Sequence, residues 1–387
     1  MAKRVLFISN GHGEDLNGST ILQALLALRP EVQVCALPIV GEGKAYRRLG
    51  VPLIAPTQSL PSGGFLYMGY DQLWRDVRSG LLPLLWQQCS ALRQFRGDFV
   101  CAVGDVVVIL AALLTGCRFA VFLVSSSAFY EGRLKLPWLA RWGLWHPRCE
   151  IVFTRDRFSA LDLQNQGLGK AEFHGYPIMD LVQGEQGAQI ASPEPIVALL
   201  PGSRLPECGH NLALQLQIIE ILQQEVGFAV QGWAALVPAL AENLAQFVEP
   251  IGWSLVQPGV LRKGGIDVCY SSSAFGEILR KCHIVIGMAG TAVEQAVGLG
   301  KPVIQVPGEG PQFNYRFAEA QNRLLGLSVR TIGTQPATLD TLRQAARAIP
   351  QILQDQEYLQ ACQRNGKIRV GEAGGAAGIA RRLLDFL

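Results

Sequence analysis

The sequence predicts an α/β protein made of two doubly wound, Rossmann-like domains that face a central cleft. Short β-branched apolar runs alternate with helical patterns along the chain, which indicates parallel sheets covered by helices on both faces. Several of these runs end in glycine-containing loops, for example at 10–18, 201–204 and 287–292. A length of 387 residues is too great for one ordinary core, so we expect two domains.

The order of the elements follows from the same patterns. We expect strands at 4–9, 32–37, 99–103, 119–124, 150–153, 196–200, 227–231, 266–270, 283–287 and 302–306. Helical patterns fill 20–28, 73–93, 211–224, 292–299 and 317–325, and the tail from 353 is helical around a glycine-rich break at 371–378. We place an N-terminal domain at 1–182, a polar Gly/Pro-containing linker at 183–195 and a C-terminal domain at 196–387, whose last helix can pack back on the N-terminal domain.

The composition narrows the class of protein. The net charge of +3 is too small to indicate nucleic-acid binding. The nine cysteines are scattered and form no C-x-x-C pair, which favours a reducing, cytoplasmic compartment. Residues 99–117 could be mistaken for a membrane span, but Asp105 interrupts them. We therefore expect a buried strand and helix there.

Two loops in the second half indicate an anion site. Gly202-Ser203-Arg204 follow one apolar run, and Gly290-Thr291-Ala292 open a helix after another. Small residues let the backbone approach a ligand, and the first N–H groups of a helix point toward it. The Arg204 guanidinium suits diphosphate oxygens. We predict a nucleotide diphosphate held without a metal ion or other cofactor, because the sequence has no D-x-D pair and no His/Cys cluster.

The role of three nearby polar residues stays open at this stage. Thr291 and Glu294 fit a T-x-x-E capping box, but the Glu294 carboxylate could instead accept hydrogen bonds from ribose hydroxyls. Gln312 and Asn314 lie in a Gly/Pro loop and could bind sugar hydroxyls, or the loop could be an ordinary turn.

The first glycine loop, at 9–18, does not fit a dinucleotide. Position 16 is leucine where G-x-G-x-x-G needs glycine, and Glu14 and Asp15 would repel a pyrophosphate. These acids could also simply complement the helix dipole. Gly11 and Gly13 leave the ring of His12 uncrowded, so it could take a proton from an alcohol, or it could be an ordinary surface histidine.

Several motifs are similar, in the same order, to those of lipid-A-disaccharide synthases. Residues 199–207 resemble L-L-P-G-S-R-x-x-E, 175–180 resemble G-H-P-hydrophobic-x-D, and 290–294 resemble G-T-A-x-x-E. Residues 124–127 lie where that family has V-S-P-S, and the loop at 10–18 resembles G-E-x-S-G-D. The resemblance covers roughly residues 5–315 and indicates a divergent branch.

The resemblance implies a GT-B fold and a metal-independent, inverting transfer of a sugar from a UDP-sugar to a lipid-linked acceptor. It implies nucleotide-sugar contacts for Arg204, Thr291 and Glu294, and places Gln312 and Asn314 near sugar- or ribose-binding positions. The N-terminal domain would then bind the acceptor, with Gly11, Gly13, Glu14 and Ser126 on that side.

Departures from the family pattern leave open which residue is the catalytic base. The family's G-I-D-A-P-D is Gly104-Asp105-Val106-Val107-Val108 here, so one aspartate is kept and the other is valine. His12 resembles a loop histidine of the peptidoglycan N-acetylglucosaminyltransferase, so either Asp105 or His12 can be the base. Two alternatives remain: a UDP-sugar 2-epimerase, and a nucleotide-sugar-binding protein that has lost catalysis.

Two segments of the first half mix tryptophan with basic residues, at 131–145 and 74–86. Such a mixture suits a membrane interface, so we expect a peripheral protein on the inner face of a membrane. The alternative is that the tryptophans belong to the core with arginines outside. The sequence leaves a homodimer open.

Overall fold

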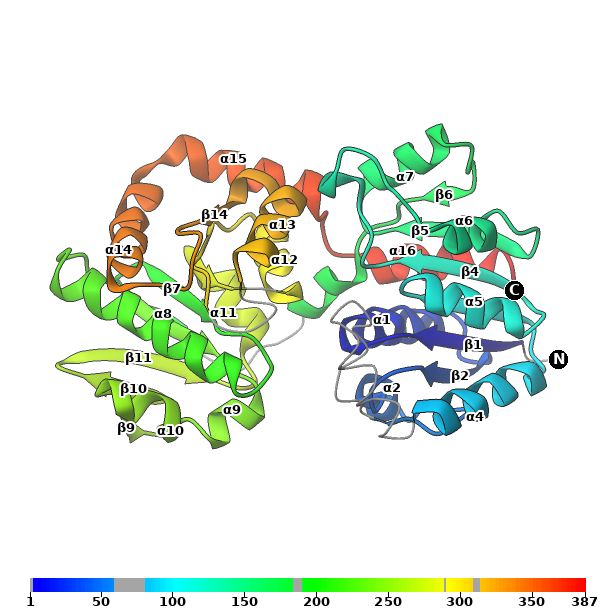
Figure 1. The fold of residues 1–387 in the computed structure, drawn as a ribbon, viewed down its shortest axis with the longest axis horizontal. Helices are drawn as coiled ribbons and strands as arrows, with labels where there is room; N and C mark the ends of the chain where they lie inside the picture. The colour runs from blue at the N-terminus through cyan, green and yellow to red at the C-terminus, as the bar shows by residue number, and fades with distance from the viewer. Residues whose placement is uncertain (1–2, 59–80, 184–189, 289, 309–313) are drawn as a thin grey trace. The chain divides into compact units, whose positions relative to one another are not determined.

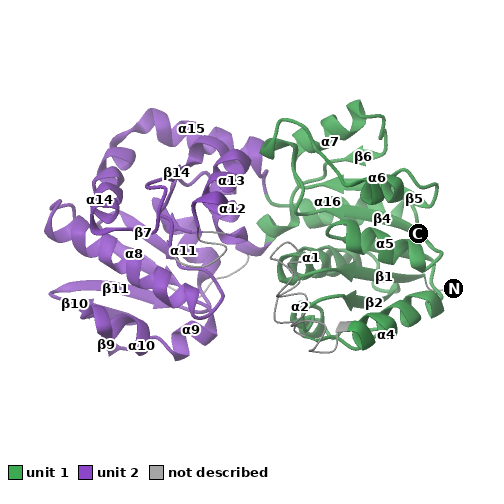
Figure 2. Cartoon of the chain, viewed as in Figure 1, with its two compact units in different colours: residues 1–180, 373–387 green, residues 181–372 purple. Residues whose placement is uncertain are grey.

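The computed structural model describes residues 3–58, 81–183, 190–288, 290–308 and 314–387. Contacts divide the chain into two units (Figure 2). Unit 1 holds Met1–Asp180 and Ala373–Leu387, and unit 2 holds Leu181–Glu372. The chain therefore leaves unit 1 once and returns to it near the C-terminus, so the last residues of the expected 196–387 domain lie in unit 1.

Unit 1 contains a six-stranded parallel sheet (Figure 1). The strand order is β2 (Gln33–Pro38), β1 (Arg4–Ser9), β3 (Phe99–Val103), β4 (Arg118–Leu123), β5 (Cys149–Thr154) and β6 (Ala171–Glu172). The central strands are buried on both faces, which explains their continuous apolar sequences.

Helices cover both faces of this sheet. They are α1 (His12–Leu28), α2 (Lys44–Arg48), α4 (Leu81–Gln94), α5 (Val106–Leu114), α6 (Trp138–Leu144), α7 (Arg157–Asn165) and α16 (Gly375–Leu384), with short 3₁₀ turns η2 (Ala128–Tyr130) and η3 (Pro177–Val182). The crossover through α1 leads from β1 to β2, toward one edge of the sheet. The crossover through α5 leads from β3 to β4, toward the other edge. Right-handed crossovers therefore place these two helices on opposite faces. α16 packs on α1, and α5 packs between α4 and α6.

Unit 2 contains an eight-stranded mixed sheet. Its order is β14 (Val329–Thr331), β13 (Val303–Gln305), β12 (Ile284–Gly287), β7 (Ile196–Leu200), β8 (Gln231–Ala235), β11 (Ile266–Ser271), β10 (Val260–Lys263) and β9 (Ser254–Gln257). The strands from β14 to β11 are parallel, and β9 and β10 are added antiparallel. The helices are α8 (Glu207–Gln224), α9 (Pro238–Glu242), α10 (Ala245–Val248), α11 (Phe275–Lys281), α12 (Thr291–Gly298), α13 (Tyr315–Leu325), α14 (Leu339–Gln354) and α15 (Gln356–Arg369), with 3₁₀ turns η4 (Glu249–Ile251) and η5 (Gly326–Ser328).

Strand β8 corrects one sequence-based expectation, because it lies at Gln231–Ala235 and not at 227–231. Residues 226–228 close the end of α8 instead. The Val226 and Phe228 amides donate to carbonyls in the last turns of α8, and Gly227 has a φ of 72°. The hairpin of β9 and β10 and the helix α14 were also absent from the expected elements.

The return of the chain to unit 1 depends on Asp180 and on small residues in α16. The Asp180 carboxylate accepts hydrogen bonds from the Gly374 and Ala376 amides, which caps the start of α16. A Cβ on Gly375 would lie 2.6 Å from backbone atoms of Gly175 and Tyr176. The glycines at 374–378 therefore allow α16 to pack directly on backbone.

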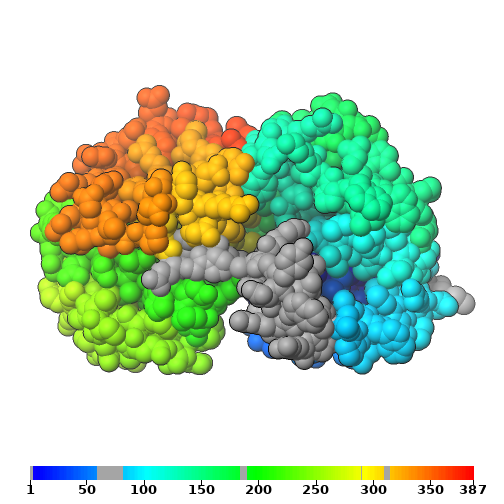
Figure 3. All heavy atoms as spheres, in the orientation of Figure 1, coloured from blue at the N-terminus to red at the C-terminus, as the bar shows by residue number. Residues whose placement is uncertain are grey.

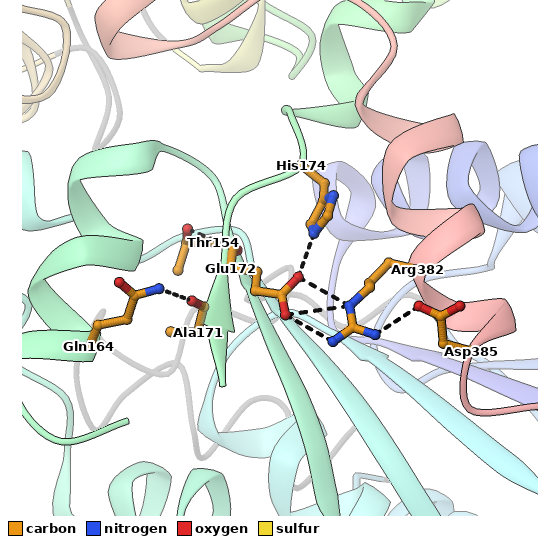
Figure 4. A network of polar contacts seen from close by, with 7 residues as sticks. All are labelled: Thr154, Gln164, Ala171, Glu172, His174, Arg382 and Asp385. Carbon is orange, nitrogen blue, oxygen red and sulfur yellow. Dashed lines mark hydrogen bonds and ion pairs between the residues drawn. The ribbon is translucent and has the colours of Figure 1, made fainter. Parts of the chain in front are cut away.

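A polar network fixes the other end of α16 (Figure 4). Arg382 donates to both oxygens of Glu172, with Nη2 to Oε1 at 3.0 Å and Nε to Oε2 at 3.2 Å. His174 Nε2 lies 2.6 Å from Glu172 Oε2, and Arg382 Nη1 donates to Asp385 at 2.7 Å. Because the Arg382 guanidinium donates to Glu172, the pKa of that carboxyl lies below its usual value.

Among the described residues, no helix has the length and apolar character that a membrane crossing requires.

Candidate functional site

Each sheet has one point where the strand order reverses. In unit 1 the chain passes from β1 to β2 on one side and then places β3 on the other side of β1. In unit 2 it passes from β7 to β8 and later places β12 on the other side of β7. In open α/β sheets, ligands bind outside the carboxyl ends of the strands at such a point. The predicted loops follow β1 and β3 in unit 1, and β7 and β12 in unit 2.

The loop after β1 leads directly into α1. Gly11 is the N-cap, His12 is the first helical residue, and the Asp15 amide donates to the Gly11 carbonyl at 2.7 Å. Gly13 and Glu14 complete the first turn, and the His12 side chain is exposed. This arrangement places His12 and Glu14 at the carboxyl end of β1, as expected from the sequence.

Glu14 lies against the loops that follow β3 and β4. Its Oε1 accepts a hydrogen bond from the Ser125 hydroxyl at 3.2 Å. A Cβ on Gly104 would lie 3.1 Å from the carboxyl carbon of Glu14, and Gly104 has a φ of 146°, so this close approach depends on glycine. The sequence analysis assigned no role to Gly104 or Ser125. Both lie at strand ends and within segments that were compared with family motifs.

Asp105 has a structural function in addition to any chemical one. Its Oδ1 accepts from the Val107 amide at 2.9 Å and so caps α5. The same oxygen accepts from the Asn10 side chain at 3.5 Å. Asp105 also lies close enough to Glu14 for its charge to act on that carboxyl. The two predicted acids of unit 1 are thus brought together.

Burial, together with the charges of Asp105 and Asp15, raises the pKa of Glu14 to about 8, although the hydrogen bond from Ser125 opposes this shift. Burial also raises the pKa of Asp15 to about 7, although the bond from Ser9 lowers it. Carboxyls that titrate near neutral pH suit general acid–base chemistry, because they can both give and take a proton there.

Asp15 is a core residue and not only a partner of the helix dipole. It is 3% exposed, and the Ser9 hydroxyl donates to its Oδ1 at 2.5 Å. The buried Tyr46 hydroxyl donates to Ser9 at 3.1 Å. A side chain at position 18 would collide with the Tyr46 hydroxyl, which explains why Gly18 stands in this motif.

Ser126 is half-buried in the loop after β4, between two serines with defined contacts. Ser125 contacts Glu14, whereas Ser127 caps η2 and donates to Asp156 at 2.7 Å. The role of Ser126 on the acceptor side stays a prediction.

In unit 2, the loop after β7 places Arg204 just before α8. Gly202 has a φ of 104°, a conformation that favours glycine, and both Ser203 and Arg204 are exposed. The Arg204 carbonyl accepts from the Cys208 amide at 2.8 Å. Partial burial lowers the pKa of the Arg204 guanidinium, against the nearby charge of Glu207. A guanidinium stays protonated in proteins, so Arg204 presents a positive charge.

The loop after β12 corrects the capping-box interpretation. Gly290 is the N-cap of α12 with a φ of 81°, so the N-cap residue has no side chain, and Thr291 is already helical. Thr291 and Glu294 therefore do not form a T-x-x-E capping box. Ala292 is half-buried, and Glu294 is only 7% exposed.

The two other predicted residues of this region are Asn314 and Gln312. Asn314 caps α13, since its Oδ1 accepts from the Phe317 amide at 3.0 Å. Gln312 lies outside the described residues.

The buried Asn211 on α8, which the sequence analysis missed, donates to the Pro201 carbonyl at 3.1 Å. A Cβ on Gly308 would lie 2.6 Å from Asn211 Oδ1, so α8, the 201 loop and the loop after β13 approach closely.

An open pocket in unit 2 lies elsewhere. It has a volume of about 370 Å³ and is lined by residues of the C-terminal half of α8, including Glu220 and Gln224, and by Lys263. At 1.5 Å per residue, Glu220 is about 20 Å along α8 from its first residue. This pocket is therefore separate from the glycine loops.

Comparisons with known proteins agree with this architecture. The solved UDP-GlcNAc 2-epimerase from Neisseria meningitidis, bound to UDP-GlcNAc, has a TM-score of 0.56 at 14% identity, with 99% of this chain and 100% of that chain covered. MurG of Acinetobacter baumannii has a TM-score of 0.58 at 11% identity, with 99% of both chains covered. The spinosyn rhamnosyltransferase SpnG has a TM-score of 0.56 at 15% identity, with 98% and 100% covered.

The chain has the GT-B fold. Each of its two units is Rossmann-like, as the sequence predicted.

In sequence, the chain is similar to a lipid-A-disaccharide synthase from Pseudomonas putida (strain GB-1), with 29% identity over 220 residues. The match covers 55% of this chain and 52% of the relative, so the chain spans about half the length of the curated relative it matches. No protein-family model matches the sequence. Within the described residues, no group of three or more His, Cys, Asp or Glu side chains could hold a metal ion.

Proposed function

We propose that this protein is an inverting glycosyltransferase that uses no metal ion. It moves a sugar of the hexose or N-acetylglucosamine type from a UDP-sugar to a lipid-linked or amphiphilic acceptor. The observation that carries the proposal is the opposite chemistry of the two switch points in a GT-B chain. Unit 1 carries the carboxyls of Glu14 and Asp105, whereas unit 2 carries Arg204 just before α8, with the start of α12 on the neighbouring strand β12.

Unit 2 would hold the donor. The exposed Arg204 and the first amides of α8 and α12 offer hydrogen bonds to a diphosphate, and glycines at 202 and 290 leave room for close approach. The carboxylate of Glu294 would accept hydrogen bonds from ribose hydroxyls, with Thr291, Asn314 and Gln312 as further donor-site residues.

Unit 1 would activate the acceptor. Asp105 or His12 takes the proton of the acceptor hydroxyl, and the hydroxyl oxygen forms a bond to the anomeric carbon. The bond from that carbon to the diphosphate oxygen breaks, and UDP leaves with the electron pair. Glu14, with a pKa of about 8, keeps its proton at neutral pH and can donate a hydrogen bond to the acceptor. Gly11, Gly13 and Ser126 would line this side.

Calorimetry with UDP, in buffer with and without EDTA, tests the donor half of the proposal. We expect binding in both buffers, and stabilisation by about 2.7 kcal/mol at a hundredfold excess over the dissociation constant. An absence of heat with UDP would contradict the proposal, and binding that is lost in EDTA would contradict metal independence.

A UDP-sugar 2-epimerase is the second candidate, because the same fold carries a UDP-GlcNAc 2-epimerase from N. meningitidis. Incubation with UDP-GlcNAc alone separates the two. An epimerase would form UDP-ManNAc, whereas a transferase needs an acceptor and would release UDP slowly. Binding of UDP without either reaction, across a panel of donors and amphiphilic acceptors, would instead favour a nucleotide-sugar-binding protein.

A further inference from the structure

Helices α4, α5 and α6 form one side of unit 1, here called the α4–α6 face. α5 contacts both of its neighbours, and the three helices lie side by side in Figure 1. In Figure 3 the cyan surface of α4 and α5 continues into the teal surface of α6. The three helices are thus one layer with a common outer side.

Large apolar side chains are exposed on this face. Trp138 is 74% exposed and Trp142 54% on α6, and Trp86 is 73% and Leu82 62% exposed on α4. Clusters of exposed large apolar residues on a folded unit mark an interaction surface. This result decides an open point: Trp138 and Trp142 are not core residues. Trp145 is partly buried and packs against the core of unit 1.

These side chains are not needed to hold the helices on the sheet. α4 buries a separate stripe, Leu84, Gln88 and Leu92, at helical spacing. α6 buries Ala140, Gly143 and Leu144, and Gly143 allows close contact with Ile109 of α5. Each helix therefore has an inner face that packs on unit 1 and a second apolar group that faces outward.

The two segments that carry the exposed tryptophans are predominantly basic. Residues 81–97 and 133–148 contain no Asp or Glu, although Asp98 and Glu131 lie just outside them, and their exposed basic residues are Arg93, Arg96, Arg133, Lys135 and Arg141, whereas Arg148 is partly buried. α5 carries no charge. The Arg141 guanidinium lies 4.7 Å from the Trp145 ring centre, and Lys135 pairs with Glu131 at the margin of the face. Tryptophan beside arginine and lysine is typical of surfaces at the boundary between water and lipid.

We propose that the α4–α6 face docks on an anionic lipid bilayer, with Trp86, Trp138 and Trp142 inserted at the headgroup level. The absence of acidic residues in these two segments matches a negative surface. The inference goes beyond the proposed function, because docking requires neither UDP nor turnover. It would explain how an amphiphilic acceptor reaches unit 1.

Co-sedimentation with vesicles tests the proposal on the full chain. We expect binding to vesicles of phosphatidylcholine mixed with phosphatidylglycerol, and at least tenfold weaker partitioning onto phosphatidylcholine alone. The triple variant W86A/W138A/W142A should lose at least tenfold in partitioning onto the anionic vesicles. R133Q/K135Q should lose most of the preference for anionic over neutral lipid, and higher salt should weaken binding of the wild type.

Matched control residues lie in unit 2. Leu255, Val256 and Ile368 are 42%, 44% and 64% exposed, so L255A/V256A/I368A removes similar exposed apolar groups without touching the face. This control should bind vesicles like the wild type. Thermal melting and UDP calorimetry should be unchanged in the triple tryptophan variant, which separates loss of docking from misfolding and from failure of the proposed function.

Three outcomes would overturn the inference. They are no binding of the wild type to anionic vesicles, full binding by the triple tryptophan variant, and an equal loss in the unit 2 control. The first outcome would leave an acidic protein partner as the alternative for this face.

Discussion

Units 1 and 2 share one architecture but present opposite chemistry at the same topological point. In unit 1 the loops at the carboxyl ends of β1 and β3 bring Glu14 and Asp105 together, and burial together with like charge raises the pKa of Glu14. In unit 2 the loop after β7 presents Arg204, and the carboxylate of Glu294 is buried on α12. The difference teaches that two units with the same kind of fold can carry different charges at the same topological point, because a few loop residues set that charge.

The largest expected effect comes from removing the Asp105 carboxylate of unit 1. D105N keeps a side chain that can cap α5 but cannot accept a proton, so turnover should fall by about 10²–10⁴-fold if Asp105 is the base. Release of UDP in the presence of acceptor measures this. D98N, at an exposed carboxylate paired with Lys3, is the control and should keep full turnover. If D105N turns over normally, H12A should show the loss instead.

The next largest effect is expected from removing the positive charge of Arg204 in unit 2. R204A should weaken UDP binding about tenfold to a hundredfold, since a hydrogen bond to a charged group contributes about 1.5–3 kcal/mol. Calorimetry measures this. R262A, at an exposed arginine of the same unit that pairs with Asp267, should bind UDP like the wild type. Unchanged affinity in R204A would mean that the anion site of unit 2 lies elsewhere.

A third test concerns the stability of unit 1. This unit differs from unit 2 because a helix from the end of the chain, α16, completes it. In G378A the new Cβ would lie 2.6 Å from the His174 carbonyl, so the free energy of unfolding should fall by about 1–3 kcal/mol. G169A, where nothing lies within 4 Å, should change it little. Chemical denaturation compares the two. Equal stability would show that α16 does not need backbone contact with unit 1.

The last test uses a pH dependence that arises in unit 1. Because the pKa of Glu14 is raised from 4.5 to about 8, the folded state binds its proton more tightly than the unfolded state does. This contribution to stability is fully present below pH 4.5 and is lost as pH rises toward 8. E14Q should therefore gain stability relative to the wild type over this range, by at least about 1 kcal/mol. Denaturation at several pH values measures the difference between the two proteins, which removes contributions from other groups. A constant difference would contradict the raised pKa.

Much of the fold could be predicted from local patterns. The buried parallel strands have continuous apolar sequences because helices cover both faces, so β1, β3, β7 and β12 were found close to their observed bounds. The hairpin of β9 and β10 was missed because both strands are short, β9 is exposed along its length and neither has a strong apolar pattern. The start of β8 was misjudged because Phe228 is apolar, yet its amide closes α8.

The candidate site also contains some residues that local patterns predict and others that they do not. Gly202, Arg204 and Gly290 could be found because glycine followed by a helix is a local signal. Ser125, Tyr46 and Asn211 could not, because their partners Glu14, Ser9 and Pro201 belong to other loops or strands. The capping box failed because Thr291 is already the first helical residue and Gly290 is the N-cap.

By itself the sequence determined the two alternating α/β halves, the glycine loops that open helices and the separation of acidic from basic loop residues. These depend on local backbone preferences and on apolar periodicity, which neighbouring residues encode. Only the tertiary structure decided that Asp105 acts on Glu14, that Asp180 caps α16 and that tryptophans stay exposed beside basic residues. Such features depend on residues that are far apart in the chain, and only the strand order of the sheets and the packing of helices on them bring those residues together.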